Sequence, residues 1–312
     1  MKKPAQALLE KFIRERNLKL IDERARVGII EGWVSMSGNL IIALVKVLCG
    51  LFTGSISLLA DAMHTISDIA TSAVVLIGFG VSKKEADDQH PFGHGRVEYL
   101  AGLIIALMLI GAGVSFILTA YDRLMAGVVM EPSLIAIFLV LFTIIFKEFL
   151  CHFSIAAAKK IDSDTLLADA MHHRTDSLTT LAVLIAITGA YFNMGYLDSI
   201  FGFGVAAYVI YTGIKIAHNS INRLMGAAPS DETHAQILDS ILNTKGVLSA
   251  HNLHIHDYGA HKSITVHIEV DGNLSMHEAH DIAHRVENNL REKNSCHCVV
   301  HLDPHNRENS PE

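Results

Sequence analysis

The sequence ADAMHTISD at residues 60–68 returns as ADAMHHRTD at residues 168–176. Both copies lie within long apolar segments, where a charged side chain is costly and usually marks a binding site or an ion pathway. In each copy an aspartate follows the histidine by four residues, which places both side chains on one face of an α-helix, about 6 Å apart along its axis. The repeated stretch therefore predicts two membrane helices that each present one imidazole and one carboxylate in a single direction.

The two pairs are His64 with Asp68 and His172 with Asp176. If their helices face each other, two nitrogens and two oxygens surround one point, and this ligand set suits tetrahedral Zn²⁺. The alternative is a set of hydrogen bonds that joins the helices of a bundle. We favour the metal site, because ionisable groups inside a membrane are functional by default and because the set is repeated.

Further ionisable residues lie in the apolar segments. Asp61 and Asp169 each precede a motif histidine by three residues, where they could accept a hydrogen bond from its imidazole or carry protons. Lys46, Lys147 and Glu148 occur in other apolar segments, and we expect them to form ion pairs with a structural role.

The composition is that of a membrane domain followed by a soluble one. The 312 residues have a mean hydropathy of +0.34, and half are apolar, mainly in the first two thirds. A net charge of −7 gives no indication of a nucleic-acid partner. Nineteen histidines, eleven of them after residue 250, indicate metal binding. The four cysteines form no disulfide framework, and residues 1–28 do not resemble a signal peptide.

Six apolar segments have about the 20 residues that a bilayer requires. They lie at residues 29–52, 57–82, 97–121, 132–157, 164–191 and 197–219. Lysine and arginine gather in the loops on the side of the basic N-terminus, so the positive-inside rule places both termini in the cytoplasm. Spans two and five are then antiparallel, with their motifs at middle depth. Residues 5–26 predict a basic amphipathic helix, either on the membrane surface or packed on the soluble tail.

The loop DDQHPFGHGR at residues 87–96 holds another possible metal site. Its glycines and proline prevent a regular helix, so side chains three or four residues apart can curl around one ion. Asp87, His90 and His94 therefore predict a second zinc site. An ordinary polar loop is the alternative.

From about residue 228 the pattern becomes that of a soluble α/β domain. Periodicity predicts an α-β-β-α-β order, which forms a small open sheet with helices on one face. The expected elements are a helix at 231–243, strands at 247–258 and 263–270, a helix at 276–292 and a strand at 296–302.

Strand alternation sorts the polar residues of this domain. Cys296 and Cys298 share a face and are expected to be buried small apolar residues rather than ligands. The outward residues and their neighbours that could converge on one or two metal ions are His251, His267, His280, His301 and Asp303. Spacing assigns no partner to His254, His256, His277, His284 and His297.

Four separated motifs resemble the cation diffusion facilitator family, close to its bacterial YiiP-type iron/zinc branch. They are GSIS at 54–57 leading into the first repeat, ADDQHPFGHGRVE at 86–98, the second repeat, and VHLDP at 300–304. The resemblance covers residues 28–305 and implies a homodimeric metal/proton antiporter with six transmembrane helices and a metallochaperone-like cytosolic domain.

The resemblance also implies where the sites fall. The transport site would be His64, Asp68, His172 and Asp176; the loop site Asp87, His90 and His94; and a cytosolic dimer-interface site His251, His267, His280, His301 and Asp303. The implied parts are an N-terminal segment (1–28), a transmembrane domain (29–222), a histidine-rich metal-binding and dimerisation domain (223–306) and a tail (307–312).

Two positions depart from the family pattern. His64 stands where YiiP-like members carry aspartate and resembles the animal zinc transporters, which shifts the expected substrate toward Zn²⁺ and away from Cd²⁺ or Mn²⁺. Gly226 stands where family members often carry aspartate, so an ion pair from Arg96 to that position is not expected.

We therefore expect an inner-membrane protein that exports Zn²⁺ from the cytoplasm in exchange for protons by alternating access, in contact with membrane lipid. The alternatives are export of Fe²⁺, Co²⁺, Ni²⁺, Cd²⁺ or Mn²⁺, or a membrane-anchored metal sensor. An intramembrane zinc hydrolase is disfavoured, because the sequence has no HExxH motif and four inward ligands leave no open coordination position.

Overall fold

The computed structural model divides the chain into two compact units. One is helical (Met1–Val81 and Val97–Ile221), and the other is an α/β unit (Ser82–Arg96 and Asn222–Glu312). The residues that the structure describes are 10, 20–53, 62, 65, 66, 68–126, 134–191, 196–259, 261–294 and 296–305.

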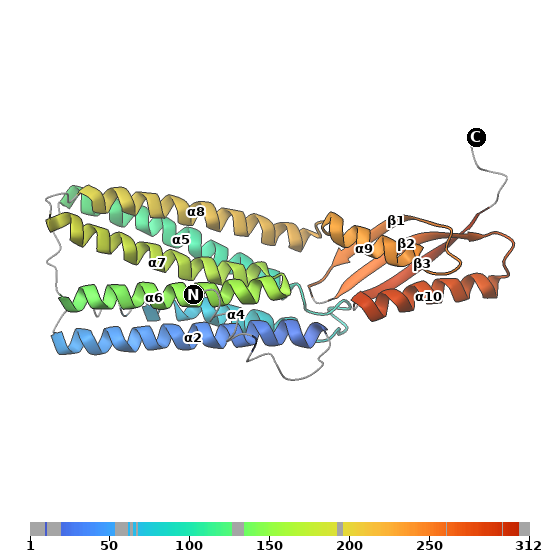
Figure 1. Cartoon of the computed structure of the whole chain (residues 1–312), viewed down its shortest axis with the longest axis horizontal. Coiled ribbons are helices and arrows are strands. Elements are labelled where there is room, and N and C mark those ends of the chain that lie inside the picture. Colours follow the sequence, from blue (N-terminus) through green and yellow to red (C-terminus); the bar gives the residue numbers. More distant parts are fainter. Residues whose placement is uncertain are drawn as a thin grey trace. The chain divides into compact units, whose positions relative to one another are not determined.

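Long helices that run side by side make up the helical unit (Figure 1). They are α2 (Leu20–Thr53), α4 (Ile69–Ser82), α5 (Val97–Ala126), α6 (Leu134–Ile161), α7 (Asp164–Tyr191) and α8 (Tyr196–Met225). Helix α7 packs on both α5 and α6, and α2 packs on α6. The second repeat on α7 therefore lies inside the unit and not at its edge.

Among the described residues, four helices are long and apolar enough to cross a membrane: Glu23–Cys49, Val97–Asp122, Ile137–Ile161 and Ile200–Met225. Helix α7 is long enough to cross a membrane, but its composition is not apolar enough, because it carries the charged and polar residues of the second repeat. Helix α4 has 14 residues, and most of the first half of the span expected at 57–82 lies outside the described residues. Large apolar side chains remain exposed along the helices, as they do on a surface that faces lipid; examples are Leu44, Ile77, Leu107, Phe138 and Ile145.

One boundary expected from the sequence differs from the structure at the first helix. Helix α2 begins at Leu20, so it is continuous through residue 29, where the first span was expected to begin. Most of the amphipathic segment expected at 5–26 lies outside the described residues.

A buried carboxylate, Glu98, joins three helices at one end of this unit. Arg24 of α2 donates two hydrogen bonds of 2.7 Å to the carboxylate oxygens of Glu98 on α5. Ser163, in the turn between α6 and α7, donates a third of 2.6 Å. Because Glu98 is 1% exposed, this pairing is needed to offset its desolvation. It fixes where α7 begins and thus the position of the second repeat.

The α/β unit has the element order that the sequence predicts. It contains α9 (Asp231–Leu242), β1 (Ser249–Asp257), β2 (Lys262–Asp271), α10 (Met276–Asn294) and β3 (Cys296–His305). The sheet order is β1-β2-β3, with β1 antiparallel and β3 parallel to the central β2. Both helices contribute to one core with the alternate residues of the strands.

The cysteines of β3 are core residues, as predicted. Cys296 and Cys298 are 5% and 4% exposed and pack with Ile264, Val266 and residues of α10. Burial raises the pKa of the Cys298 thiol to about 12. A thiol held in its protonated form is a poor metal ligand, so a metal site on this sheet would have to use the residues of the opposite face.

Candidate metal centres

Three of the four residues expected at the transport site meet inside the helical unit. Asp68 lies just before α4, and His172 and Asp176 lie on α7. One ligand atom of each lies within 4.8 Å of the other two, and all three residues are buried. The His172 Nε2 atom lies 3.6 Å from an oxygen of Asp68 and 3.7 Å from an oxygen of Asp176. His64 and Asp61 lie outside the described residues.

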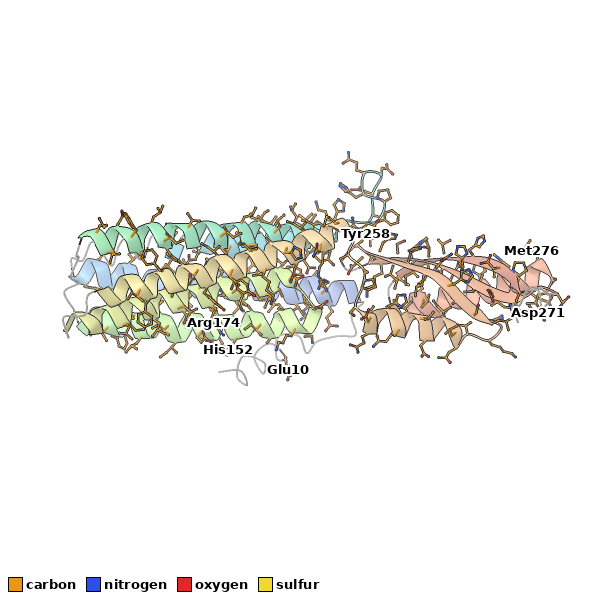
Figure 2. All side chains as sticks on the ribbon, turned by 90° about the horizontal axis from the view of Figure 1, so that it is seen from above. Glu10, His152, Arg174, Tyr258, Asp271 and Met276 are labelled. Carbon is orange, nitrogen blue, oxygen red and sulfur yellow. The ribbon has the colours of Figure 1, made fainter. Side chains whose placement is uncertain are left out.

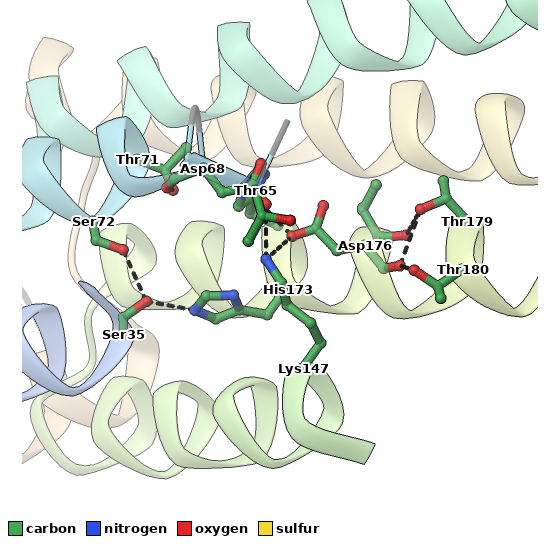
Figure 3. Close-up of polar contacts among 12 residues, drawn as sticks. Ser35, Thr65, Asp68, Thr71, Ser72, Lys147, His173, Asp176, Thr179 and Thr180 are labelled. Carbon is green, nitrogen blue, oxygen red and sulfur yellow. Dashed lines mark hydrogen bonds and ion pairs between the residues drawn. The ribbon is translucent and has the colours of Figure 1, made fainter. Parts of the chain in front are cut away.

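A lysine that the sequence analysis did not assign to this site lies within it. The Nζ atom of Lys147 on α6 is 2.9 Å from Asp68 Oδ2 and 2.5 Å from Asp176 Oδ2 (Figure 3). Lys147 is 1% exposed, so its ammonium bridges the two carboxylates away from solvent. The sequence shows that Lys147 lies within an apolar span. Spacing along the chain does not show which carboxylates on other helices this lysine contacts.

The other expected intramembrane pairs have separate partners. Glu148, next to Lys147, lies 2.8 Å from Arg174 of α7 and 3.4 Å from His152 of its own helix. Figure 2 labels His152 and Arg174 among the side chains of the helical unit. Lys46 of α2 donates a 3.0 Å hydrogen bond to Thr65.

A second buried cluster lies beside the first on α7 and includes two residues that the sequence analysis missed. One ligand atom from each of Glu31, Asp169 and His173 lies within 4.8 Å of the others, and all three are 0% exposed. Asp169 was expected to face His172, but its Oδ2 lies 3.2 Å from Nε2 of His173. The spacing between Asp169 and His173 is four residues, so the same rule that indicated the first site could have indicated this pair.

The loop residues Asp87, His90 and His94 lie together at the surface of the α/β unit. Asp87 is 3.4 Å from His90 Nδ1 and 3.5 Å from His94 Nε2. Backbone N–H groups of His90 and Gln89 donate to Asp87 at 2.7 and 3.0 Å, and the first of these contributes most to lowering its carboxyl pKa. The loop therefore presents an ionised carboxylate between two imidazoles.

A fourth group lies on the outward face of the sheet. Asp303 is 3.0 Å from Nδ1 of His267, 3.2 Å from Nε2 of His251 and 3.4 Å from Nε2 of His301. Strand register explains the convergence, because His251, His267 and His301 are paired across β1, β2 and β3. His280 is not brought to this group within the chain. It lies on the exposed side of α10, which packs on the opposite face of the sheet, and its ring is 4.5 Å from that of His284.

Comparison with known proteins places the chain in a family. The family model described as "Cation efflux transmembrane domain" matches residues 32–225, and "Cation efflux protein, cytoplasmic domain" matches residues 229–305. The chain belongs to the cation efflux family. This confirms the family expected from the motifs. The chain is therefore a membrane transporter and not an enzyme.

Relatives within the cation efflux family align along most of the chain. An uncharacterized transporter of Methanocaldococcus jannaschii is 33% identical over 271 residues, which cover 86% of this chain and 96% of the relative. The cation-efflux pumps FieF of Pectobacterium atrosepticum and Citrobacter koseri are 30% and 29% identical, covering 85% of this chain and 89% and 88% of their own lengths. These pumps also fit the YiiP-type branch.

Proposed function

We propose that this cation efflux protein exports Zn²⁺ from the cytoplasm in exchange for protons. The observation that carries the proposal is the meeting of Asp68, His172 and Asp176 in the buried interior of the helical unit. His64 precedes Asp68 by four residues and would supply the fourth ligand. Two imidazole nitrogens and two carboxylate oxygens favour Zn²⁺ over larger cations that prefer oxygen ligands.

The Lys147 ammonium is the group that the metal must replace. Its contacts of 2.9 and 2.5 Å are made with Asp68 Oδ2 and Asp176 Oδ2, and the latter is also the Asp176 oxygen that lies 3.7 Å from His172 Nε2. A metal ion can bind both carboxylates only after this amine moves away, and the flexible four-carbon stem of lysine allows that movement. When the metal leaves, the returning ammonium compensates two carboxylates that would otherwise be unpaired charges inside the membrane.

Proton exchange follows from the ligand chemistry. Zinc binds only deprotonated ligands, so zinc and protons compete for the imidazoles of His64 and His172. In the proposed cycle Zn²⁺ enters from the cytoplasm, the protein alternates to an outward-open state, and external protons help to release the ion. The two conformations must differ in their affinity for zinc for this exchange to be directional.

We propose six transmembrane helices in the inner membrane, with both termini in the cytoplasm. Four described helices have the length and apolar composition of spans, and α4 and α7 carry the site between them. The low apolar content of α7 is the consequence of its ligands, which face other helices and not lipid. The cationic residues of the loops support this orientation by the positive-inside rule.

The α/β unit would act in a homodimer. Its outward sheet face carries the group of Asp303 with three histidines, whereas His280 lies on α10. His280 can therefore join a metal site with that group only when two chains come together. Metal could bind at this group and at the loop residues Asp87, His90 and His94. Such binding would bias transport if these sites bind metal more tightly in one conformation of the transporter than in the other.

Metal uptake by inside-out vesicles tests the proposal. Vesicles that contain the protein should accumulate Zn²⁺ while their lumen becomes more alkaline, as an enclosed pH-sensitive dye reports, because protons leave the lumen in exchange for Zn²⁺. Collapsing the proton gradient should slow uptake. Parallel assays with Fe²⁺, Co²⁺, Ni²⁺, Cd²⁺ and Mn²⁺ establish the preferred ion. If one of these ions is taken up faster than Zn²⁺, that ion and not zinc is the preferred substrate. Metal binding by the protein without flux would favour a membrane-anchored sensor.

A further inference from the structure

The cluster of Glu31, Asp169 and His173 is built from two helices inside the helical unit. Glu31 is on α2, and Asp169 and His173 are one turn apart on α7. Hydroxyl groups surround them: Ser154 donates to Glu31 Oε1 at 2.5 Å, and Ser35 donates to Asp169 Oδ2 at 3.0 Å. Ser35 Oγ also lies 2.5 Å from His173 Nε2 and accepts from Ser72 at 3.0 Å (Figure 3).

These contacts do not satisfy the cluster. Within the described part of the chain, Glu31 Oε2, Asp169 Oδ1 and His173 Nδ1 have no hydrogen-bond partner, although all three residues are 0% exposed. A network whose purpose is structural is expected to satisfy its buried polar atoms, because each unsatisfied one costs free energy. Two carboxyl groups that approach each other in a buried site cannot both stay ionised without compensation, so either a shared proton or a bound cation must lie between them.

The charge environment differs from that of the neighbouring site. At the first site, Lys147 supplies a cation to both carboxylates. Among the described residues, the hydrogen-bond and ion-pair partners of Glu31 and Asp169 are serine hydroxyls, His173 and each other, and none is a lysine or arginine. A cation at this cluster would therefore meet no resident ammonium that it had to displace.

We propose that Glu31, Asp169 and His173 form a second site for a divalent cation within the helical unit. Two carboxylates, one imidazole and the hydroxyl of Ser35 provide mixed oxygen and nitrogen ligands, which suit Zn²⁺, Fe²⁺ or Mn²⁺. Asp169 precedes His172 by three residues, so the two sites are adjacent along α7, about 5 Å apart along its axis. The identity of the ion rests on the proposed function: the site holds a second ion of the transported class next to the first.

The decisive experiment is an anomalous diffraction or cryo-electron-microscopy map of the full-length protein in lipid with saturating Zn²⁺. The expected result is one peak enclosed by Asp68, His172 and Asp176, and another enclosed by Glu31, Asp169 and His173. A peak at the first position alone overturns the second site and leaves the proposed transport site intact. A peak at the second position alone supports this inference and contradicts the proposed transport site. An absence of both peaks overturns both.

Metal counting provides an independent test. Equilibrium dialysis of the purified full-length protein against Zn²⁺ should show one fewer bound ion per chain in Glu31→Gln than in the wild type. The matched control is Glu23→Gln, on the same helix but partly exposed and paired with Lys160, which should bind as many ions as the wild type. Equal counts in Glu31→Gln and the wild type would overturn the proposal. If Glu31→Gln does not fold, as judged by size-exclusion chromatography, the wild-type map alone decides.

Discussion

At the scale of single residues, Lys147 has the largest consequence for how the site works. Its ammonium contacts the same two carboxylates that the proposed function assigns to the metal. The expected role of Lys147, a structural ion pair, is thus incomplete, because the pair is made with two of the candidate ligands. If the proposed site binds a metal ion, Lys147 would compete with that ion and would offset one of the two carboxylate charges of the metal-free site.

We expect Lys147→Met to bind Zn²⁺ about tenfold or more tightly than the wild type, because the metal no longer displaces a resident cation (tenfold corresponds to about 1.4 kcal/mol). Turnover should fall, since the emptied site keeps two carboxylates without a counter-charge. Zinc titration of the purified protein and flux in proteoliposomes measure the two effects. Lys160→Met, which removes a surface pair with Glu23, is the control. Weaker zinc binding in Lys147→Met would show that the lysine holds the ligands in place and does not compete.

At the scale of secondary-structure elements, helix α10 shows how a short stretch of sequence determines where a helix begins. Ser275 and Glu278 form a capping box: Glu278 N–H is 3.3 Å from Ser275 Oγ, and Glu278 Oε2 accepts from Ser275 N–H at 2.9 Å and Ser275 Oγ at 2.7 Å. The hydrogen bonds from Ser275 lower the carboxyl pKa of Glu278. Its stabilising effect is therefore present above the pKa of the unfolded state and is lost as pH falls through the lowered pKa of the folded state.

Ser275→Ala should accelerate amide hydrogen exchange in the first turn of α10 at neutral pH, because it removes the hydroxyl that accepts from Glu278 N–H and donates to the Glu278 carboxylate, while the bond from the backbone N–H of residue 275 remains. Ser275→Thr keeps the hydroxyl and should exchange like the wild type. Acidification below the folded-state pKa of Glu278 should reduce the difference between Ser275→Ala and the wild type. Hydrogen-exchange mass spectrometry on the full chain follows these amides. A difference that grows on acidification would contradict the assigned cap.

The elements also show what sequence reasoning can and cannot reach. In the α/β unit, period-two alternation predicted the element order, the buried cysteines and the outward face of β2, because each strand has one covered face. In the helical unit, the spacing of four residues paired His172 with Asp176 within α7, but the sequence analysis did not apply it to Asp169 and His173. It did not find Glu31 or Lys147, which come from α2 and α6, because helix rotation and neighbour choice are set by packing and not by local periodicity.

At the scale of the whole molecule, the candidate metal sites fall into two kinds that differ in their exposure to solvent. The buried clusters on α7 are shielded from solvent, as a transported ion requires. The groups at Asp87 and Asp303 are exposed or half-buried on the α/β unit, where a metal ion in solution could reach them. The sequence predicted that the outward strand residues converge, but a single chain does not bring His280 to them, since α10 covers the other face of the sheet.

Asp303→Asn should weaken metal binding by the α/β unit more than tenfold and reduce the metal-dependent dimer, because one carboxylate contacts all three histidines of the group. Analytical ultracentrifugation in detergent, with and without Zn²⁺, measures the dimer. Asp281→Asn, an exposed position on α10, is the control. If Asp303→Asn leaves the dimer fraction unchanged at every zinc concentration, the group of Asp303 and its three histidines is not needed for dimerisation.

The central claim is that Asp68, His172 and Asp176 bind the transported ion. Zinc flux in proteoliposomes that contain Asp176→Asn tests it most directly, with Asp164→Asn in the first turn of the same helix as the control. The account predicts that Asp176→Asn lowers flux at least tenfold, while Asp164→Asn transports like the wild type. Undiminished zinc flux in Asp176→Asn would contradict it.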